Sequence, residues 1–513
     1  MLHAFARLLG ATLLVASLVA CRDRSQRSAA PLASARGENA LSAARNPGSP
    51  PSSVAAPSAT ASAASSAAAE RVVRHGIAWF HDAPAAALAL AKRERKPLVV
   101  DLWAGWCHTC LSMQEYVLTA SKLPGANERF VFLAIDTELP SNAAFLQQHA
   151  VSVWPTFYVL APEGAEIRGR WLGAATPAQF ARFLADGERA LDLVHGEKSE
   201  AAPLARLRRG DELAAEKRFK EAANEYTAAL REAPANWARR PEAMIALASA
   251  YKQTHATVAC AEAYLNAPSL VDTAPLSAAD LAATALACGS ELPRADSRIG
   301  KLRTRARAEL ERLCTNAHTE LTPDDRGDAC GLWIELCETL KDTTCVKRAA
   351  ATRLSVLEDA ARGMPDEVAA MYDFARSDTL LKLGREQDAL ALLEARERAL
   401  PQNYNPPHQL ARAYRHLKRW PDGLAAIDRA LALAYGPRRL SLLGVKVDLL
   451  LGAGKKPDAL GVLAEQLLGY RALPEGQKRP DPERKVAERL ESLGGKLPLE
   501  GEGAEPVGAK GPN

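Results

Sequence analysis

Two cysteines separated by two residues are the part of this sequence best suited to chemistry. They are Cys107 and Cys110 in the motif Trp-Cys-His-Thr-Cys, directly after the apolar run at 97–103. This pattern predicts a buried strand followed by a helix that begins at the cysteines. At a helix start, free backbone N–H groups and the helix dipole favour the thiolate of the first cysteine. The spacing therefore predicts a reversible dithiol.

Two other uses of a Cys-x-x-Cys pair fit the sequence less well. Covalent haem attachment requires a histidine directly after the second cysteine, and this chain has Leu111 there. A structural zinc site requires a second pair of ligands at matching spacing, and none follows nearby. We therefore expect no metal, and no cofactor beyond a redox-active disulfide between Cys107 and Cys110.

The N-terminus indicates export. An apolar run at 8–20 follows a basic start, and Leu-Val-Ala before Cys21 matches the pattern cleaved and lipidated in bacterial lipoprotein precursors. We predict a signal peptide at 1–20 and a mature chain acylated at Cys21; a secretory signal that happens to end in cysteine is the alternative. Arg22 stands where aspartate is associated with inner-membrane retention in some bacteria. This favours a periplasm-facing protein anchored in the outer membrane.

Composition bounds the rest of the chain. Its 513 residues are 48% hydrophobic and 25% charged, which is globular material long enough for more than one core. The formal net charge of +4 gives no argument for a nucleic-acid partner. Residues 21–70 consist almost wholly of Ala, Ser, Pro, Gly and scattered charge. So little bulky apolar surface cannot offset the entropy of ordering, so we expect a disordered tether.

Residues 71–193 alternate between strand and helix patterns, as one α/β domain does. The expected helices lie at 84–95, 109–119, 143–149 and 176–190. The expected strands lie at 98–103, 130–135, 156–160 and 167–171, and the last two are joined by a Pro-Glu-Gly turn.

Helical periodicity without strand patterns follows at 204–470. The small residues Ala389, Gly423 and Ala459 recur at intervals of 34 and 36, which is the period of tetratricopeptide repeats. Gly210 and Tyr226 occupy the small and aromatic positions of a first unit. Both ends of this region resemble tetratricopeptide repeats, whereas 266–365 lacks a clean signature. We predict an all-α solenoid, followed at 471–513 by a charged helix near 480–493 and a disordered tail.

Residues 97–185 resemble the thioredoxin superfamily, and most of all the exported thiol-disulfide interchange proteins. Four features carry the resemblance: Asp101 six residues before Cys107, the Trp-Cys-x-x-Cys motif, Trp154 followed by Pro155 and a threonine, and Gly-Ala at 173–174. The fold class implied for the chain is an α/β thioredoxin-like domain followed by an all-α solenoid.

The resemblance implies a role for each of three catalytic residues. A partly exposed Cys107 would attack the substrate and form a mixed disulfide, and Cys110 would resolve it. Asp101 occupies the position that accepts the Cys110 proton in thioredoxins. Because a carboxyl desolvated inside so apolar a strand has a raised pKa, it is a usable base near neutral pH.

Three further residues are expected to bind substrate. Trp154-Pro155 matches the family's cis-proline, which faces the dithiol and leaves the backbone of Trp154 free to pair with an extended peptide. The bulky Trp154 and Trp106 would then influence which substrate fits.

The chain also departs from the family pattern. Phe132 stands where thioredoxins carry a lysine near the buried carboxyl, and His108 begins a dipeptide that is not the Gly-Pro of reducing thioredoxins. A protonated His108 would stabilise the Cys107 thiolate and make the pair more oxidising, whereas a solvated one would do little. The direction of electron flow stays open.

Six more cysteines lie in the degenerate middle of the solenoid. In an exported chain an even set indicates structural disulfides, and buried reduced thiols are the alternative. Because antiparallel hairpins bring together positions on either side of one turn, the expected pairs are Cys260 with Cys288, Cys314 with Cys330, and Cys337 with Cys345.

The sequence as a whole favours a membrane-anchored thiol-disulfide oxidoreductase of the bacterial envelope. Its expected partners are protein thiols or disulfides, a protein or peptide recruited by the helical repeats, and the membrane through an N-terminal lipid, with no nucleic acid. The alternative is an envelope interaction scaffold whose thioredoxin-like domain is structural or redox-sensing.

Overall fold

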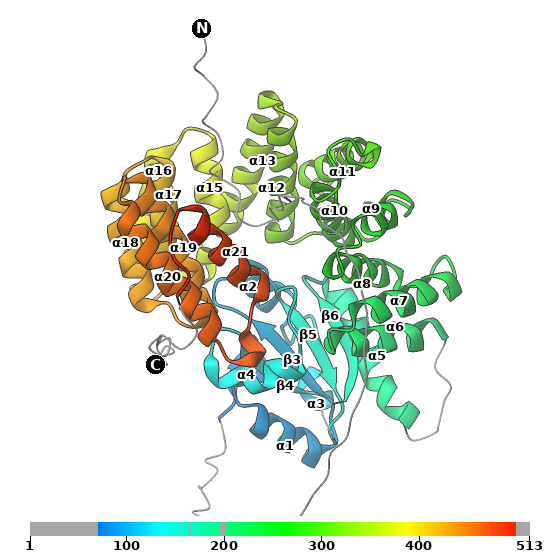
Figure 1. Cartoon of the computed structure of the whole chain (residues 1–513). Helices are drawn as coiled ribbons and strands as arrows, with labels where there is room; N and C mark the ends of the chain where they lie inside the picture. The colour runs from blue at the N-terminus through cyan, green and yellow to red at the C-terminus, as the bar shows by residue number, and fades with distance from the viewer. Residues whose placement is uncertain (1–69, 164–165, 195–201, 499–513) are drawn as a thin grey trace, which may run out of the picture.

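The computed structural model describes residues 70–163, 166–194 and 202–498. The predicted signal peptide, Cys21, the tether and the end of the tail lie outside the described residues. Within the described ranges, a mixed sheet with helices is followed by helices alone (Figure 1). The predicted fold class, an α/β domain followed by an all-α region, is confirmed.

The first domain is built on a six-stranded sheet with the order β1-β2-β4-β3-β5-β6. Strands β2, β3 and β4 run parallel, while β1 pairs antiparallel with β2, β5 with β3, and β6 with β5. Since β3 lies between β4 and β5, every residue of its Leu-Val-Val-Asp-Leu run is buried. The strands are β1 (Val72–Arg74), β2 (Ile77–His81), β3 (Leu98–Trp103), β4 (Val131–Asp136), β5 (Thr156–Leu160) and β6 (Ile167–Leu172).

Helices cover both faces of this sheet. Apolar side chains of α2 and α5, among them Met113 and Phe180, pack on one face, and those of α1 and α4, among them Leu90 and Leu146, pack on the other. Helix α2 ends three residues earlier than expected, because the N–H of Leu118 bonds back to the Met113 carbonyl and closes the turn. The helices are α1 (Pro84–Glu94), α2 (His108–Tyr116), α3 (Ala126–Arg129), α4 (Ala143–Gln148) and α5 (Pro177–Val194).

Helices α6 to α21 form consecutive packed hairpins. Small residues permit the close approach of paired helices: a Cβ on Gly210 would lie 2.4 Å from the Tyr226 ring, and one on Gly423 would lie 2.5 Å from Leu449. The helices are α6 (Ala202–Ala215), α7 (Phe219–Glu232), α8 (Arg240–Gln253), α9 (Thr257–Leu265), α10 (Pro275–Ser290), α11 (Ser297–Thr315), α12 (Pro323–Thr339), α13 (Thr343–Ala361), α14 (Asp366–Ala369), α15 (Asp373–Lys382), α16 (Glu386–Ala399), α17 (Asn405–His416), α18 (Trp420–Leu433), α19 (Gly436–Gly452), α20 (Lys456–Ala472) and α21 (Pro480–Ser492), with short 3-10 turns η2 (Ala370–Tyr372) and η3 (Glu475–Gln477).

Three disulfides join neighbouring helices where the repeat pattern is weakest. They are the pairs named from the sequence: Cys260–Cys288 between α9 and α10, Cys314–Cys330 between α11 and α12, and Cys337–Cys345 between α12 and α13. The bonded cysteines are 28, 16 and 8 positions apart. Each disulfide therefore lowers the conformational entropy of the unfolded chain as well as linking two folded helices.

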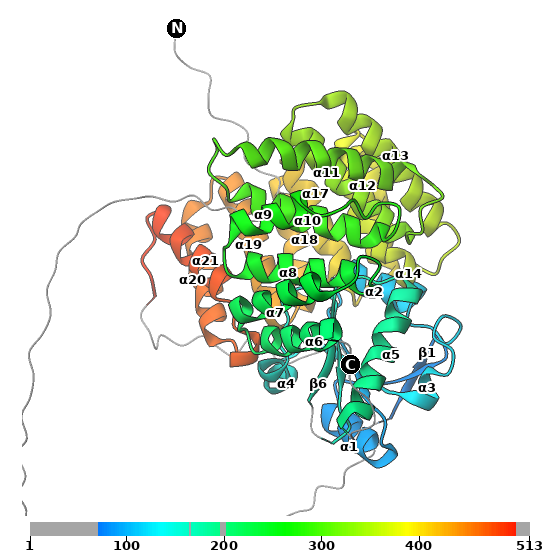
Figure 2. The same cartoon turned by 90° about the vertical axis from the view of Figure 1, so that its right-hand side faces the viewer.

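The helical region forms an arch whose two ends both rest on the first domain (Figure 1). Its start packs on β6 and α5, where Gln179 Nε2 donates to Glu242 Oε1 at 3.1 Å, and α6 to α11 stack away from the sheet (Figure 2). Its far end returns to the loop after β4, where Gln477 Nε2 donates to the carbonyls of Thr137 and Leu139 at 2.9 and 3.0 Å. Between these two ends, helices of the arch contact the first domain around the start of α2.

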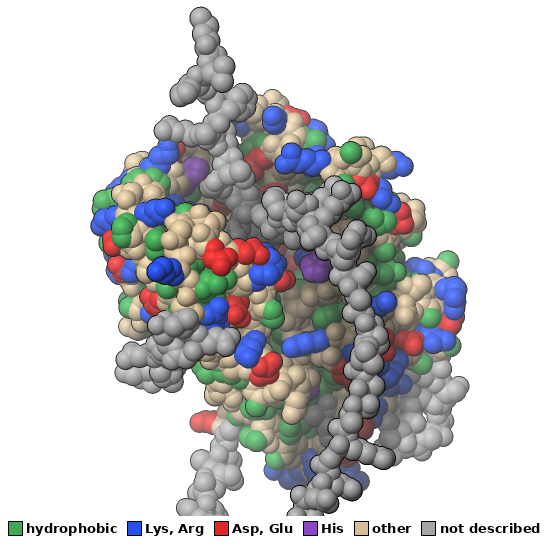
Figure 3. Space-filling model, in the orientation of Figure 1, with side chains coloured by type: hydrophobic (Ala, Val, Ile, Leu, Met, Phe, Trp, Pro, Cys, Tyr) green, Lys and Arg blue, Asp and Glu red, His purple; other side chains and the backbone are tan. Residues whose placement is uncertain are grey.

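The visible surface carries acidic and basic side chains interspersed, in keeping with the small net charge (Figure 3). Among the described residues, we find no helix that combines the length and the apolar character needed to span a bilayer.

Candidate active site

The two cysteines lie at the start of α2 and are joined as a disulfide. Cys107 is the N-cap residue, and its Sγ accepts a hydrogen bond from the Cys110 backbone N–H at 3.0 Å. This contact and the helix N-terminus both favour a thiolate at Cys107 once the bond is reduced. Cys107 is only 4% exposed and Cys110 is fully buried. The expectation of a partly exposed Cys107 is therefore wrong, because Trp106 and Trp154 pack against the cysteines.

Two tryptophans close one side of the dithiol. The rings of Trp106 and Trp154 are 5.4 Å apart between centroids, and both pack against the cysteines. Trp106 Nε1 donates to Glu138 Oε1 at 3.1 Å, and Trp154 Nε1 donates to Thr137 Oγ1 at 2.9 Å. Both indoles are thus fixed to the loop after β4. The Trp154–Pro155 peptide bond is cis.

Helical repeats far along the chain complete this cover. On α17, Asn405 Nδ2 donates to the Gly105 carbonyl at 2.9 Å, two residues before Cys107. The guanidinium groups of Arg438 and Arg479 lie over the two indoles, at 5.2 and 4.8 Å from the ring centroids. Such cation–π contacts stabilise a closed arrangement.

Asp101 lies on β3, the strand that precedes the motif in the chain, and is 1% exposed. Burial raises its pKa from the ordinary 3.8 to about 7, although a hydrogen bond from Gln114 and the charge of Arg74 act in the opposite direction. Its Oδ1 has no hydrogen-bond partner among the described residues. Asp101 is therefore a carboxyl that gains and loses a proton near neutral pH.

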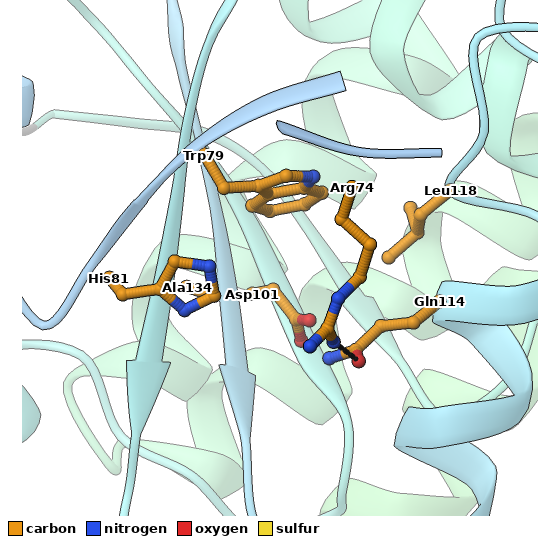
Figure 4. A pocket seen from close by; sticks show the side chains of 7 residues that line it. All are labelled: Arg74, Trp79, His81, Asp101, Gln114, Leu118 and Ala134. Carbon is orange, nitrogen blue, oxygen red and sulfur yellow. Dashed lines mark hydrogen bonds between the residues drawn. The ribbon is translucent and has the colours of Figure 1, made fainter. Parts of the chain in front are cut away.

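The neighbours of Asp101 form a small pocket (Figure 4). Arg74, from the edge strand β1, donates to Gln114 Oε1 beside the carboxyl. Arg74 supplies the positive charge that the lysine supplies in thioredoxins. The sequence of the short strand β1 has no pattern that would have predicted this role for Arg74. Gln114 could have been found, since it lies four residues after Cys110 and therefore on the same face of α2. His81 also lines this pocket.

His108, between the two cysteines, points away from the sheet toward α12. Its Nδ1 lies 3.0 and 3.1 Å from the two carboxylate oxygens of Asp324, and its Nε2 lies 3.9 Å from Asp328 Oδ2. Burial alone would lower the pKa of His108, but Asp324 and Asp328 raise it to about 10. The sequence left the protonation state of His108 open, because no sequence pattern connects it to Asp324, 216 positions away.

Among the described residues, the ligand atoms of His108, Asp324 and Asp328 lie within 4.8 Å of one another, which is close enough to hold a metal ion. Because Nδ1 is already at hydrogen-bond distance from both oxygens of Asp324, we interpret the group as an ion pair between the His108 imidazolium and the Asp324 carboxylate.

Comparisons with known proteins agree with the fold of the first domain. Residues 84–188 match the thioredoxin-like domain family, so this segment is a thioredoxin-like domain. The thiol:disulfide interchange protein DsbD of Cronobacter sakazakii (strain ATCC BAA-894) is 33% identical over 99 residues. That match covers 19% of this chain and 17% of the relative. Both findings support thiol-disulfide exchange as the chemistry of the site.

A crystal structure of a thermophilic TPR protein from Thermus thermophilus is 20% identical and covers 48% of this chain and 100% of its own. Its TM-score is 0.24. The helical repeats of this chain are assigned from the packing of consecutive helices against one another.

Proposed function

We propose that this protein is a thiol-disulfide oxidoreductase of the bacterial envelope that exchanges disulfides with protein or peptide substrates through Cys107 and Cys110. The observation that carries the proposal is a disulfide at the N-terminus of α2 together with a buried, titratable carboxyl that Gln114 of the same helix contacts. A dithiol kept only as a staple has no need of such a base.

The reaction runs in two exchange steps. The Cys107 thiolate attacks a substrate disulfide, so a bond forms between Cys107 and one substrate sulfur while the other substrate sulfur leaves as a thiolate. Cys110 then loses its proton and attacks Cys107 Sγ, which releases the first substrate sulfur. The substrate is reduced by two electrons and the protein dithiol is oxidised. Run backward, the same steps oxidise a substrate dithiol.

Asp101 serves the second step. Because its pKa is about 7, it takes the Cys110 proton on resolution and returns it when the exchange reverses. Gln114 bonds to this carboxyl from the face of α2 that also carries Cys110. Trp106, Trp154 and Pro155 then form the surface against which the substrate segment lies.

The envelope location and the anchor belong to the same proposal. The apolar leader and the Leu-Val-Ala-Cys motif ending at Cys21 support export and lipidation. Three disulfides in the helical region are typical of an oxidising compartment. We place the protein on the periplasmic side of the outer membrane, where protein thiols and disulfides are its partners.

A Cys110→Ser variant of the full chain tests this function. Without the resolving thiol, mixed disulfides between Cys107 and a model disulfide peptide should accumulate and be visible on non-reducing gels. The matched control carries Cys107→Ser as well and should trap nothing. Failure of the single variant to form any mixed disulfide, with the peptide or with periplasmic proteins, rejects the oxidoreductase.

One observation favours a second candidate, an interaction scaffold whose thioredoxin-like domain is structural: Cys107 is almost fully enclosed. In that case the arch would be the binding element and the disulfide a staple. Equilibration with glutathione separates the two candidates, because a structural disulfide has a potential below about −300 mV and resists reduction by that couple.

A further inference from the structure

Building on the proposed function, we infer that Asp324 and Asp328 of helix α12 are positioning residues of the redox site. They hold His108 as an imidazolium beside Cys107, so the helical repeats set the balance between dithiol and disulfide. The repeats are then a part of the reaction centre as well as a partner-binding element.

The contact is direct and specific. Both carboxylate oxygens of Asp324 lie within 3.1 Å of His108 Nδ1, and the Asp324 side chain is only 5% exposed. Asp324 is in the first turn of α12, where Thr322 caps the helix by accepting from the Asp325 N–H at 3.1 Å. The helix dipole favours a negative charge at that position. A buried carboxylate there requires a cation, and His108 is the one it contacts.

The registration of α2 against the repeats fixes this pair. Ser112 Oγ lies 3.4 Å from Thr322 Oγ1, and Tyr116 Oη lies 2.7 Å from Tyr372 Oη. With His108, these residues follow a spacing of four and lie on one face of α2. Each turn of the helix therefore contacts the arch. Disulfides at Cys314–Cys330 and Cys337–Cys345 hold α12 to both of its neighbours.

Other charged groups around His108 do not cancel the effect. Arg353 on α13 acts against the imidazolium. Asp280 on α10 lies near Asp328, and burial raises its pKa to about 7. Burial likewise raises the pKa of Asp325 to about 8, so this neighbour is mostly neutral at pH 7. Asp324 is thus the carboxylate that pairs with the ring.

The consequence for the dithiol follows from charge. An imidazolium next in the chain to Cys107 stabilises its thiolate, which exists only in the reduced form. Stabilising the reduced form makes the disulfide a stronger oxidant. Asp324 therefore acts on the sulfur through His108, and its own negative charge opposes that action.

A double-mutant cycle in the full chain tests the inference. Its variants are Asp324→Asn, His108→Gln and the double variant, with Asp325→Asn as a matched control in the same helical turn. The first readout is the NMR titration of the His108 ring in the oxidised protein. The second readout is the equilibrium constant between dithiol and disulfide in glutathione buffers.

Asp324→Asn should lower the proton affinity of His108 by about three orders of magnitude, because only a drop of that size from a pKa of about 10 removes the imidazolium at neutral pH. It should also shift the equilibrium at least threefold toward the disulfide, about 14 mV for a two-electron couple. In the His108→Gln background that shift should vanish or change sign, and the control should match the wild type. Asp328→Asn should act in the same direction and more weakly, which keeps the test available if the Asp324 variant folds poorly.

Equal equilibrium constants for Asp324→Asn and wild type overturn the inference. It is also overturned if Asp324→Asn shifts the equilibrium equally in the wild-type and His108→Gln backgrounds. A wild-type disulfide that never equilibrates with glutathione would reject the proposed function instead. The NMR titration would then still decide whether Asp324 holds the imidazolium.

Discussion

Replacing Asp101 by asparagine should stabilise the protein at alkaline pH. The carboxyl is 1% exposed, and its Oδ1 has no hydrogen-bond partner among the described residues. Ionisation of the buried Asp101 carboxyl therefore destabilises the fold. Asparagine has nearly the same shape and keeps an acceptor beside Gln114, so it removes the charge without leaving a cavity.

The sign and the size follow from the pKa. Because the pKa of Asp101 rises from 3.8 in the unfolded chain to about 7 in the fold, the native state binds the proton more tightly. Stability is then lost as the pH rises between those values, and the loss is complete above pH 7. At 1.36 kcal/mol per pKa unit, the full loss is about 4 kcal/mol. About 3 kcal/mol of this develops between pH 5 and pH 8.5.

This change in stability is measured by urea denaturation of the oxidised full chain at pH 5 and pH 8.5. Unfolding is followed by tryptophan fluorescence and far-UV circular dichroism. The advantage of Asp101→Asn over the wild type should grow by about 3 kcal/mol across this range. Asp458→Asn, which changes an exposed carboxylate at the start of α20, should show no such growth. An advantage of equal size at both pH values would refute the argument that burial of a charge destabilises the wild type.

Three further results are expected. Gly210→Ala should destabilise the first hairpin by about 1 to 3 kcal/mol in thermal or urea unfolding, because its Cβ would fall 2.4 Å from the Tyr226 ring. Asn405→Ala should speed the alkylation of reduced Cys107 by a bulky maleimide several-fold, because it loosens the cover over the active-site loop; an unchanged rate would show that the cover does not limit access. Replacing Cys288 by serine should lower the free energy of unfolding by about 3 to 4 kcal/mol, as expected for a loop of that length, and an unchanged urea midpoint would contradict it.

Local patterns predicted most elements of the first domain. The apolar run before the cysteines had to be a central strand, because it offered apolar side chains to both faces, and Asp101 within it is buried as expected. The bonded cysteine pairs likewise follow from helical hairpins, since each pair spans a single connection between consecutive helices. Both inferences concern residues close in sequence, where the periodicity of strands and helices limits the possible partners.

Contacts between residues far apart in the sequence could not be predicted from these local patterns. The loop before Cys107 is contacted by Asn405, which lies 300 positions from Gly105, the residue that it bonds. The state of His108 depends on Asp324, and the charge near Asp101 comes from Arg74 on a three-residue edge strand. A repeat pattern predicts how each hairpin packs on the next, but it does not predict where the arch turns back onto another domain.

This closure changes what the isolated first domain can be expected to do. Without the arch, Trp106 and Trp154 would lose the guanidinium groups that cover them, and His108 would lose its carboxylate. A solvated imidazole with an ordinary pKa near 6.5 is mostly neutral at about pH 7.5 and no longer favours the Cys107 thiolate. The excised domain should therefore be a weaker oxidant, with a more exposed nucleophile, than the full chain. If both have the same dithiol equilibrium and the same rate of Cys107 alkylation, then the arch contributes nothing to the chemistry and serves only to bind.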